Sequence, residues 1–237
     1  MNEPATRSFT TDPAAAEASD RIRSFKARQG RISALTSSTL ATLGARYLIA
    51  PESAFDAKRA FGHDLPVIVE IGCGFGEATM AMAAREPHTA IVAIDVHTRG
   101  VARLMQRLQA ESISNVRVVH GDAVAFLTDA VTPGSLAGVR IFFPDPWPKA
   151  RHHKRRLVQR PFVDMLAARL APEAVLHIAT DWAPYAAQML SVLTACPVLE
   201  NAHEEYAPRP HWRPLTRYES AGLDKGHDVY DLVFVRR

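Results

Sequence analysis

The stretch Val67-Ile-Val-Glu-Ile-Gly-Cys-Gly-Phe-Gly76 decides the fold of this chain. Its first five residues form a short apolar run that predicts a buried parallel strand. Its glycines let the backbone turn tightly and let a ligand approach closely. Because open α/β sheets bind nucleotides at the turn that follows a strand, we expect a nucleotide-cofactor site at this loop.

Apolar runs and segments of helical spacing alternate on the C-terminal side of this loop. The pattern predicts strands at residues 90–95, 116–119, 138–143, 175–179 and 229–235, and helices at 77–85, 98–111, 157–170 and 183–193. This alternation predicts an α/β domain over residues 67–237 with a mostly parallel sheet. Ligands of such sheets bind beyond the carboxyl ends of the strands, which is where each motif below lies.

The chain before the first strand is less regular. Residues 1–20 predict a disordered tail, and residues 21–66 predict a basic segment (21–31) that leads into an irregular stretch (51–66). The 237 residues are 47% hydrophobic, which suits one α/β domain with a short extension. No apolar run approaches the ~18 residues of a membrane span, and the two cysteines match neither a disulfide framework nor a zinc site. We expect a cytoplasmic protein, monomeric or homodimeric, that uses no membrane and no metal.

The glycine loop indicates which nucleotide cofactor binds. Its spacing is G-x-G-x-G over Gly72, Gly74 and Gly76, whereas a dinucleotide fingerprint reads G-x-G-x-x-G. Glu70, inside the preceding strand, would repel a pyrophosphate but not a cation. S-adenosylmethionine carries a sulfonium and an ammonium group and no phosphate. The charge therefore favours S-adenosylmethionine and methyl transfer.

Two further carboxylates follow the next two predicted strands. Asp95 ends its strand, where it would accept hydrogen bonds from both ribose hydroxyls; the alternative is an ordinary loop carboxylate. Asp122 follows the third strand, where it would meet the adenine amino group; the alternative is a simple helix cap. The glycine loop and the carboxylates that follow the next strands together predict an S-adenosylmethionine site.

The run Phe142-Phe-Pro-Asp-Pro-Trp-Pro-Lys149 follows the fourth predicted strand. Its three prolines fix φ and stiffen the loop. Asp145 then lies near the methyl group to be transferred, Trp147 offers a face for stacking a base, and Lys149 would contact a phosphate or a base acceptor. The alternative is a rigid turn with Trp147 packed in the core.

Basic and polar segments complete the set of candidates. Arg151-His-His-Lys-Arg-Arg156 is dense enough in positive charge to bind a phosphate backbone, or it is a solvated surface. Asp181, in Thr180-Asp-Trp182, either faces the same crevice or caps a helix. Thr216-Arg-Tyr-Glu219 reads as a polar loop before the last strand and says little on its own.

These motifs together resemble the bacterial tRNA (guanine-N7-)-methyltransferases, from about Arg28 to the C-terminus. The Pro-Asp-Pro-Trp-Pro-Lys run with a basic string behind it is the most specific mark. The resemblance implies a Rossmann-like class I methyltransferase fold, with a seven-stranded sheet, an antiparallel last strand and helices on both faces. It also implies methyl transfer from S-adenosylmethionine to N7 of guanine 46 in the tRNA variable loop, leaving S-adenosylhomocysteine. The family often has glutamate where this chain has Asp95.

The resemblance assigns roles residue by residue. The cofactor site would be lined by Glu70, Gly72, Gly74, Gly76, Asp95, Asp122 and Asp145, and Asp145 would also be the catalytic residue. The tRNA substrate would be held by Lys149, Arg151, His152, His153, Lys154, Arg155, Arg156, Asp181, Thr216, Arg217, Tyr218 and Glu219.

Two other functions compete with this one. An amino-group methyltransferase would place two prolines and an aromatic residue after its polar residue, whereas here Trp147 follows Pro146 directly and the polar residue is acidic. An RNA-binding protein that uses the fold without catalysis would not need the carboxylates and the rigid loop.

Overall fold

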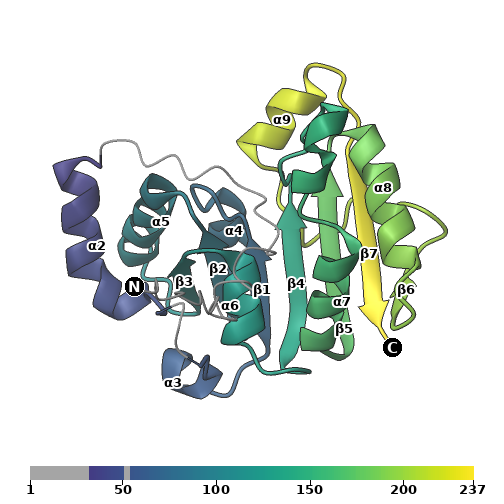
Figure 1. Cartoon of the computed structure of the whole chain (residues 1–237). Helices are drawn as coiled ribbons and strands as arrows, with labels where there is room; N and C mark the ends of the chain where they lie inside the picture. The colour runs from purple at the N-terminus through teal and green to yellow at the C-terminus, as the bar shows by residue number, and fades with distance from the viewer. Residues whose placement is uncertain (1–31, 51–53) are drawn as a thin grey trace, which may run out of the picture.

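The computed structural model describes residues 32–50 and 54–237 (Figure 1). Within them, one seven-stranded sheet has the order β3-β2-β1-β4-β5-β7-β6. Strands β1 to β5 run parallel, and β7 pairs antiparallel with both β5 and β6. The strands are β1 (Val67–Ile71), β2 (Ala90–Asp95), β3 (Val116–His120), β4 (Leu136–Phe142), β5 (Leu170–Thr180), β6 (Leu199–Asn201) and β7 (Tyr230–Arg236).

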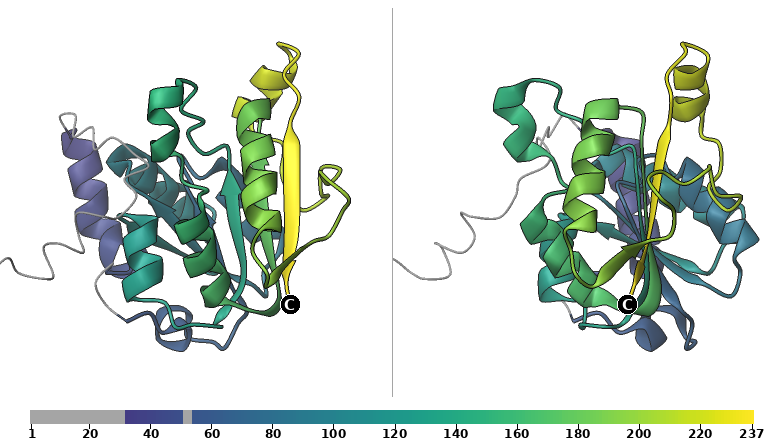
Figure 2. Two further views of the ribbon diagram at one scale, coloured as in Figure 1. Left: turned by 45° about the vertical axis from the view of Figure 1, so that its right-hand side comes forward. Right: turned by 90° about the vertical axis from the view of Figure 1, so that its right-hand side faces the viewer.

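Helices cover both faces of this sheet (Figure 2). They are α2 (Ala34–Tyr47), α3 (Ala57–Phe61), α4 (Glu77–Arg85), α5 (Thr98–Ala110), α6 (Ala123–Asp129), α7 (Arg160–Arg169), α8 (Ala183–Thr194), α9 (Arg217–Leu223) and the 3-10 helix η1 (Ala150–Arg155). One hydrophobic core lies between the sheet and α2, α4 and α5, and a larger one lies between the sheet and α6, α7 and α8. No described helix is long and apolar enough to cross a membrane.

Strand β2 shows how the sequence builds these two cores. Side chains of a strand alternate between the faces of the sheet. Ala90, Val92 and Ile94 accordingly join the larger core, while Ile91 and Ala93 join the core under α4 and α5. A strand that is apolar on both faces belongs in the middle of a sheet covered on both sides, as its apolar run predicts.

The elements that were not predicted from the sequence lack a strong apolar period. Helix α2 packs on α5 and is begun by Ser33, whose Oγ accepts a hydrogen bond from the Thr36 amide. Its fully buried residues are Thr36, Thr39, Gly44 and Tyr47, and Leu40 and Leu43 are only partly buried, so its apolar stripe is weak. Helix α3 lies within the stretch expected to be irregular, and β6 is only three residues long. The tail and the basic segment 21–31 lie outside the described residues.

Two features project beyond the carboxyl ends of the strands. One is η1, in the teal-green part of the chain, and the other is α9. The side view shows that these two elements lie on opposite sides of the sheet (Figure 2). Helix α9 begins at the run Thr216–Glu219, so the prediction of a loop there is wrong. Thr216 is its N-cap and accepts a hydrogen bond from the Glu219 amide at 3.2 Å. This is the pattern of a helix start rather than of a free loop.

Candidate active site

A pocket of about 300 Å³ lies at the carboxyl ends of β1, β2 and β4. Strand β1 lies between β2 and β4, so this is the point where the strand order reverses, the usual ligand position in an open α/β sheet. Four predicted residues, each just after or at the end of a different strand, line the pocket together: Gly72, Asp95, Asp122 and Asp145. Most of the remaining lining is apolar, from Ile71, Ile94, Val96, Ala123, Val124, Ile141, Phe142, Phe143, Pro144 and Leu157.

The glycine loop takes a backbone path that only glycine follows easily. Gly72, Gly74 and Gly76 all have positive φ, at 81°, 55° and 75°. A Cβ on Gly76 would also lie 2.4 Å from Leu104 of α5. Gly100, likewise on α5, meets the loop from the other side, because a Cβ there would lie 2.3 Å from the Gly74 carbonyl oxygen. Gly100 is not predicted from the sequence, because a glycine within a helical pattern does not reveal what its backbone touches.

Asp95 holds the glycine loop in place. Its Oδ2 accepts a hydrogen bond from the Gly74 amide at 2.7 Å, and its Oδ1 accepts one from the His97 amide at 2.7 Å. Each carboxylate oxygen has a second lone pair. The loop-bracing role and a ligand-binding role are therefore compatible in one side chain.

Glu70 lies behind the glycine loop rather than on the pocket wall. It is 3% exposed, and its Oε2 accepts a hydrogen bond from the Thr79 hydroxyl at 2.5 Å. Burial raises the pKa of Glu70 to about 7, and the Thr79 hydrogen bond and the nearby Arg140 oppose this rise. Glu70 is not among the residues that line the pocket.

Asp122 is both a pocket residue and a helix cap. Its Oδ1 accepts a hydrogen bond from the Val124 amide at 2.9 Å at the start of α6. The capping alternative is thus correct for one carboxylate oxygen. The residue still lines the pocket, so the cap sets the direction of its side chain.

The loop that carries Asp145 is held in an unusual conformation. Asp145 is exposed, and its neighbours Phe143 and Trp147 have positive φ values of 53° and 41°. Left-handed backbone is costly for residues with a side chain, so surrounding contacts must hold it. One of these contacts is the hydrogen bond from the Phe143 amide to the Ala179 carbonyl at 2.8 Å.

Trp147 joins this loop to the basic segment. The Arg155 guanidinium lies over the Trp147 ring at 4.3 Å from its centroid. The ring of His152 stacks on Trp147 at 5.9 Å with an interplanar angle of 23°. Trp147 is half-buried and belongs to neither hydrophobic core, so the alternative of a core-packed tryptophan is wrong.

The basic segment does not present all its charges to solvent. Lys149, Arg151 and Lys154 are exposed, and His152, His153 and Arg155 are half-buried. Arg156 is only 2% exposed, and its Nε donates to the Pro146 carbonyl at 2.8 Å. The expectation that Arg156 contacts RNA does not fit this placement, because its guanidinium is already inside the protein.

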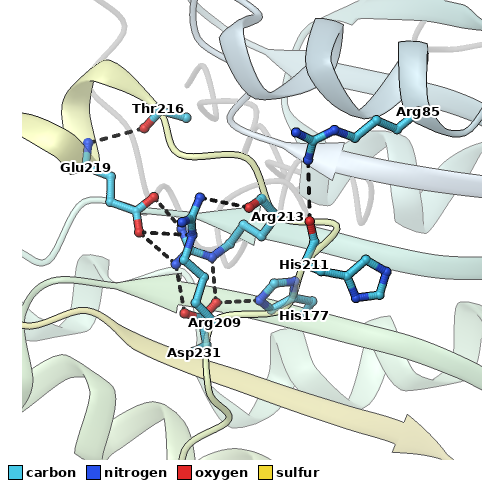
Figure 3. Close-up of polar contacts among 8 residues, drawn as sticks. All are labelled: Arg85, His177, Arg209, His211, Arg213, Thr216, Glu219 and Asp231. Atoms are coloured by element: carbon cyan, nitrogen blue, oxygen red, sulfur yellow. Dashed lines mark hydrogen bonds and ion pairs between the residues drawn. The ribbon is translucent and has the colours of Figure 1, made fainter.

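The run Thr216–Glu219 likewise contains both exposed and buried side chains. Tyr218 is 60% exposed, and its hydroxyl donates to Oδ2 of Asp181 at 3.2 Å, which brings two predicted residues together. The side chain of Arg217 is almost fully exposed. Glu219 points inward, is 2% exposed, and accepts hydrogen bonds from Arg213 at 2.6 and 2.8 Å (Figure 3). Glu219 therefore does not fit the expected role of a substrate ligand.

A buried polar cluster anchors the segment before α9 (Figure 3). Arg213 also donates to Asp231 of β7 at 2.8 Å, and Nε2 of His177 pairs with Asp231 at 2.7 Å. Trp212 Nε1 donates to His177 Nδ1 at 3.3 Å, and burial lowers the pKa of His177. This cluster is not predicted from the sequence, because its members lie far apart along the chain, on β5, on β7 and in the loop between β6 and α9.

Known proteins are similar to this chain in sequence, and others are similar to it in fold. Residues 64–232 match the family model described as "Putative methyltransferase". The tRNA (guanine-N(7)-)-methyltransferase of Streptomyces avermitilis is 50% identical over 228 residues, which cover 95% of this chain and 79% of that protein. The chain belongs to the tRNA (guanine-N(7)-)-methyltransferase family. The family member from Acidovorax sp. is 49% identical over 218 residues, covering 91% of this chain and 86% of its own.

Solved structures confirm the predicted fold. The 16S rRNA methyltransferase KamB superposes with a TM-score of 0.57 at 14% identity, covering 78% of this chain and 94% of its own. The 16S rRNA (adenine(1408)-N(1))-methyltransferase of Catenulisporales acidiphilia, solved with the cosubstrate SAM, gives a TM-score of 0.51 at 16% identity, covering 79% and 95%. At such identities these likenesses establish the class I methyltransferase fold and nothing finer.

Proposed function

We propose that this protein transfers a methyl group from S-adenosylmethionine to N7 of guanine 46 in the variable loop of tRNA. The observation that supports this proposal best is the pocket at the β1–β2–β4 edge, where Asp95, Asp122 and Asp145 meet the glycine loop. Membership of the tRNA (guanine-N(7)-)-methyltransferase family supports the substrate. Because tRNA is the proposed substrate, we place the reaction in the cytoplasm.

The pocket suits a cationic cofactor. Of its described lining residues none is a lysine or an arginine, while three are aspartates. A pyrophosphate would meet carboxylates without a cation to pair with, whereas a sulfonium and an ammonium group would be stabilised. The volume of about 300 Å³ is at the lower end of the range for small-molecule sites, and the apolar walls suit an adenine ring.

The proposed reaction depends mainly on how the guanine is positioned relative to the methyl group. S-adenosylmethionine, when bound, supplies a methyl group open to nucleophilic attack. Guanine N7 has a free lone pair and no hydrogen to lose, so no residue is required as a general base. The stiff Asp145 loop would orient the base, and orientation alone removes a large part of a bimolecular barrier. The Asp145 carboxylate would stabilise the positive charge that develops on the guanine, or grip its amino edge.

We place the RNA substrate on the elements that project above the pocket. Lys149, Arg151 and Lys154, with the half-buried His152, His153 and Arg155, would meet the phosphate backbone. Asp181, Thr216, Arg217 and Tyr218 would hold the target nucleotide from the α9 side. Arg156 and Glu219 are left out of this surface because both are buried.

The direct test is methylation of tRNA that lacks modifications. The protein is incubated with unmodified tRNA and labelled S-adenosylmethionine, and 7-methylguanine is mapped by mild base and aniline cleavage. We expect one cleavage site, at guanine 46, which disappears in a tRNA with adenine at that position. Labelling at another guanine would overturn the position, and no labelling of any tRNA would overturn the function.

A further inference from the structure

Arg156 ends the basic segment, but its side chain turns into the protein. The residue is 2% exposed, whereas Lys154, two residues earlier, is exposed. Burying a guanidinium is costly unless hydrogen bonds compensate for the lost water. Its partners therefore indicate what it does.

These partners come from two other parts of the chain. Nε of Arg156 donates to the Pro146 carbonyl at 2.8 Å, and Nη1 donates to Oε1 of Gln188 on α8 at 2.5 Å. The guanidinium also lies over the Tyr185 ring of α8, at 4.8 Å from its centroid. Gln188 is fixed in turn, because its Nε2 donates to the Val158 carbonyl at 3.2 Å. Arg156 thus ties one loop carbonyl to a packed helix.

Pro146 directly follows Asp145 in a loop that has few backbone hydrogen-bond donors. Residues 144, 146 and 148 are prolines, which have no amide hydrogen and cannot form ladder or turn hydrogen bonds through nitrogen. The loop also contains two non-glycine residues with positive φ. The prolines restrict φ within the loop, but hydrogen bonds from outside groups to its carbonyls are needed to fix where the loop lies. The Arg156 guanidinium supplies one of these hydrogen bonds, to the carbonyl of Pro146, the residue next to Asp145.

We propose, on the basis of the proposed function, that Arg156 is a positioning residue that fixes the Asp145 loop and does not bind RNA. The same residue is the C-cap of η1, where its amide donates to the His153 carbonyl at 3.0 Å. RNA bound to η1 therefore acts on a segment whose last residue holds Asp145 in place. Arg155 on Trp147 provides a second link between this segment and the loop.

The test compares Arg156→Gln and Arg156→Lys with Lys154→Gln, which removes one charge from the same segment. The lysine variant keeps the charge but lacks the planar fork that bonds Pro146 and Gln188 together. We expect both Arg156 variants to lose kcat by on the order of 10²-fold, with unchanged tRNA affinity and salt dependence. Lys154→Gln should weaken tRNA binding and lower the salt slope by about 0.7–0.9.

A spectroscopic measurement separates loop positioning from general stability. In protein labelled with 5-fluorotryptophan, the fluorine signal of Trp147, assigned with Trp147→Phe, should shift or broaden in the Arg156 variants, while the signals of Trp182 and Trp212 stay. Gln188→Met keeps the arginine and removes its acceptor on α8, so it should lower kcat several-fold and move the same signal. This variant decides the question if the Arg156 variants do not fold.

Several results would overturn the inference. One is an Arg156→Lys variant with normal kcat, or an Arg156→Gln variant that behaves like Lys154→Gln. Another is a Gln188→Met variant with normal kcat and an unmoved Trp147 signal. If the unaltered protein methylates no tRNA, the proposed function fails instead, and the fluorine signals still test whether Arg156 holds the loop.

Discussion

Two of the three pocket carboxylates, Asp95 and Asp122, have a second structural task that fixes where their oxygen atoms point. Asp95 braces the glycine loop through the Gly74 amide, and Asp122 caps α6 through the Val124 amide. Catalytic and binding groups work best when their own rotamers are locked by the surrounding protein. The competing structural and functional interpretations of these two residues are therefore not exclusive.

Asp145→Asn tests the residue proposed to stabilise the developing charge on guanine. The amide keeps the size of the side chain but removes its negative charge. We expect kcat to fall by roughly 10²-fold, as for other removals of one electrostatic stabiliser, while S-adenosylmethionine affinity falls less. Asp164→Asn, which removes an exposed carboxylate on α7, serves as the control and should leave kcat unchanged. Near-normal turnover of the Asp145 variant in single-turnover assays would remove Asp145 from the mechanism.

Glu70 predicts a pH dependence of stability. Its pKa in the folded protein is about 7, above the ordinary value of 4.5, because burial disfavours the charged carboxylate. The folded state then holds a proton that the unfolded state releases, so this contribution to stability is present below about pH 4.5 and is lost as the pH rises through 7. The loss is on the order of 3 kcal/mol.

Glu70→Gln should remove this dependence, since an amide does not titrate and still accepts the Thr79 hydrogen bond. Urea unfolding of both proteins at pH 5 and pH 8 gives the comparison. We expect the variant to gain free energy of unfolding relative to the unaltered protein as the pH rises. Parallel curves for the two proteins would show that Glu70 does not titrate in this range.

At the scale of elements, α9 is held by ion pairs more than by apolar packing. Its exposed residues include Tyr218 and Leu223, while Glu219 is its buried residue. Glu219→Ala leaves the buried Arg213 guanidinium short of a partner, and breaking a buried pair in this way costs about 3 kcal/mol or more. We expect a lower unfolding midpoint, measured by thermal denaturation followed by circular dichroism.

The matched control on the same helix is Tyr218→Phe, which removes only an exposed hydroxyl and should leave the midpoint unchanged. If Glu219→Ala keeps its midpoint and loses only tRNA affinity, then Glu219 is a substrate ligand after all, as the family resemblance implied.

The elements also show which parts of the site can be predicted from the sequence and which cannot. Asp95, Asp122 and Asp145 were predicted together because they follow strands whose apolar runs are unmistakable, and carboxyl ends of parallel strands meet at one edge. The burial of Arg156 and Glu219 was missed because it depends on partners: Gln188 lies 32 residues further along the chain, and Arg213 lies in a loop with no pattern. Charged residues are read as exposed unless such partners are known.

At the scale of the molecule, exposed positive charge gathers on η1 and on its N-cap residue. Replacing Lys149, Arg151 and Lys154 together by glutamine should lower the slope of log Kd against log salt by about 2–3, since each lost phosphate contact removes about 0.7–0.9. The matched control replaces three exposed cations on α2 and α3, namely Arg46, Lys58 and Arg59. Filter binding over a salt series measures both. Equal slopes for the two triple variants would show that η1 is only a solvated surface.

The order β3-β2-β1-β4-β5-β7-β6 also divides the molecule in two. Strands β1 to β3 hold the glycine loop, Asp95 and Asp122, while β4 to β7 hold the Asp145 loop, η1 and α9 (Figure 1). In the described chain only residues 130–135 pass between these halves, and residues 132–135 are exposed. A cut there would separate a donor-binding fragment from a target-binding fragment that share the β1–β4 seam. The fold is thus suited to division into two complementing fragments, whose reassembly would restore the pocket that neither fragment contains alone.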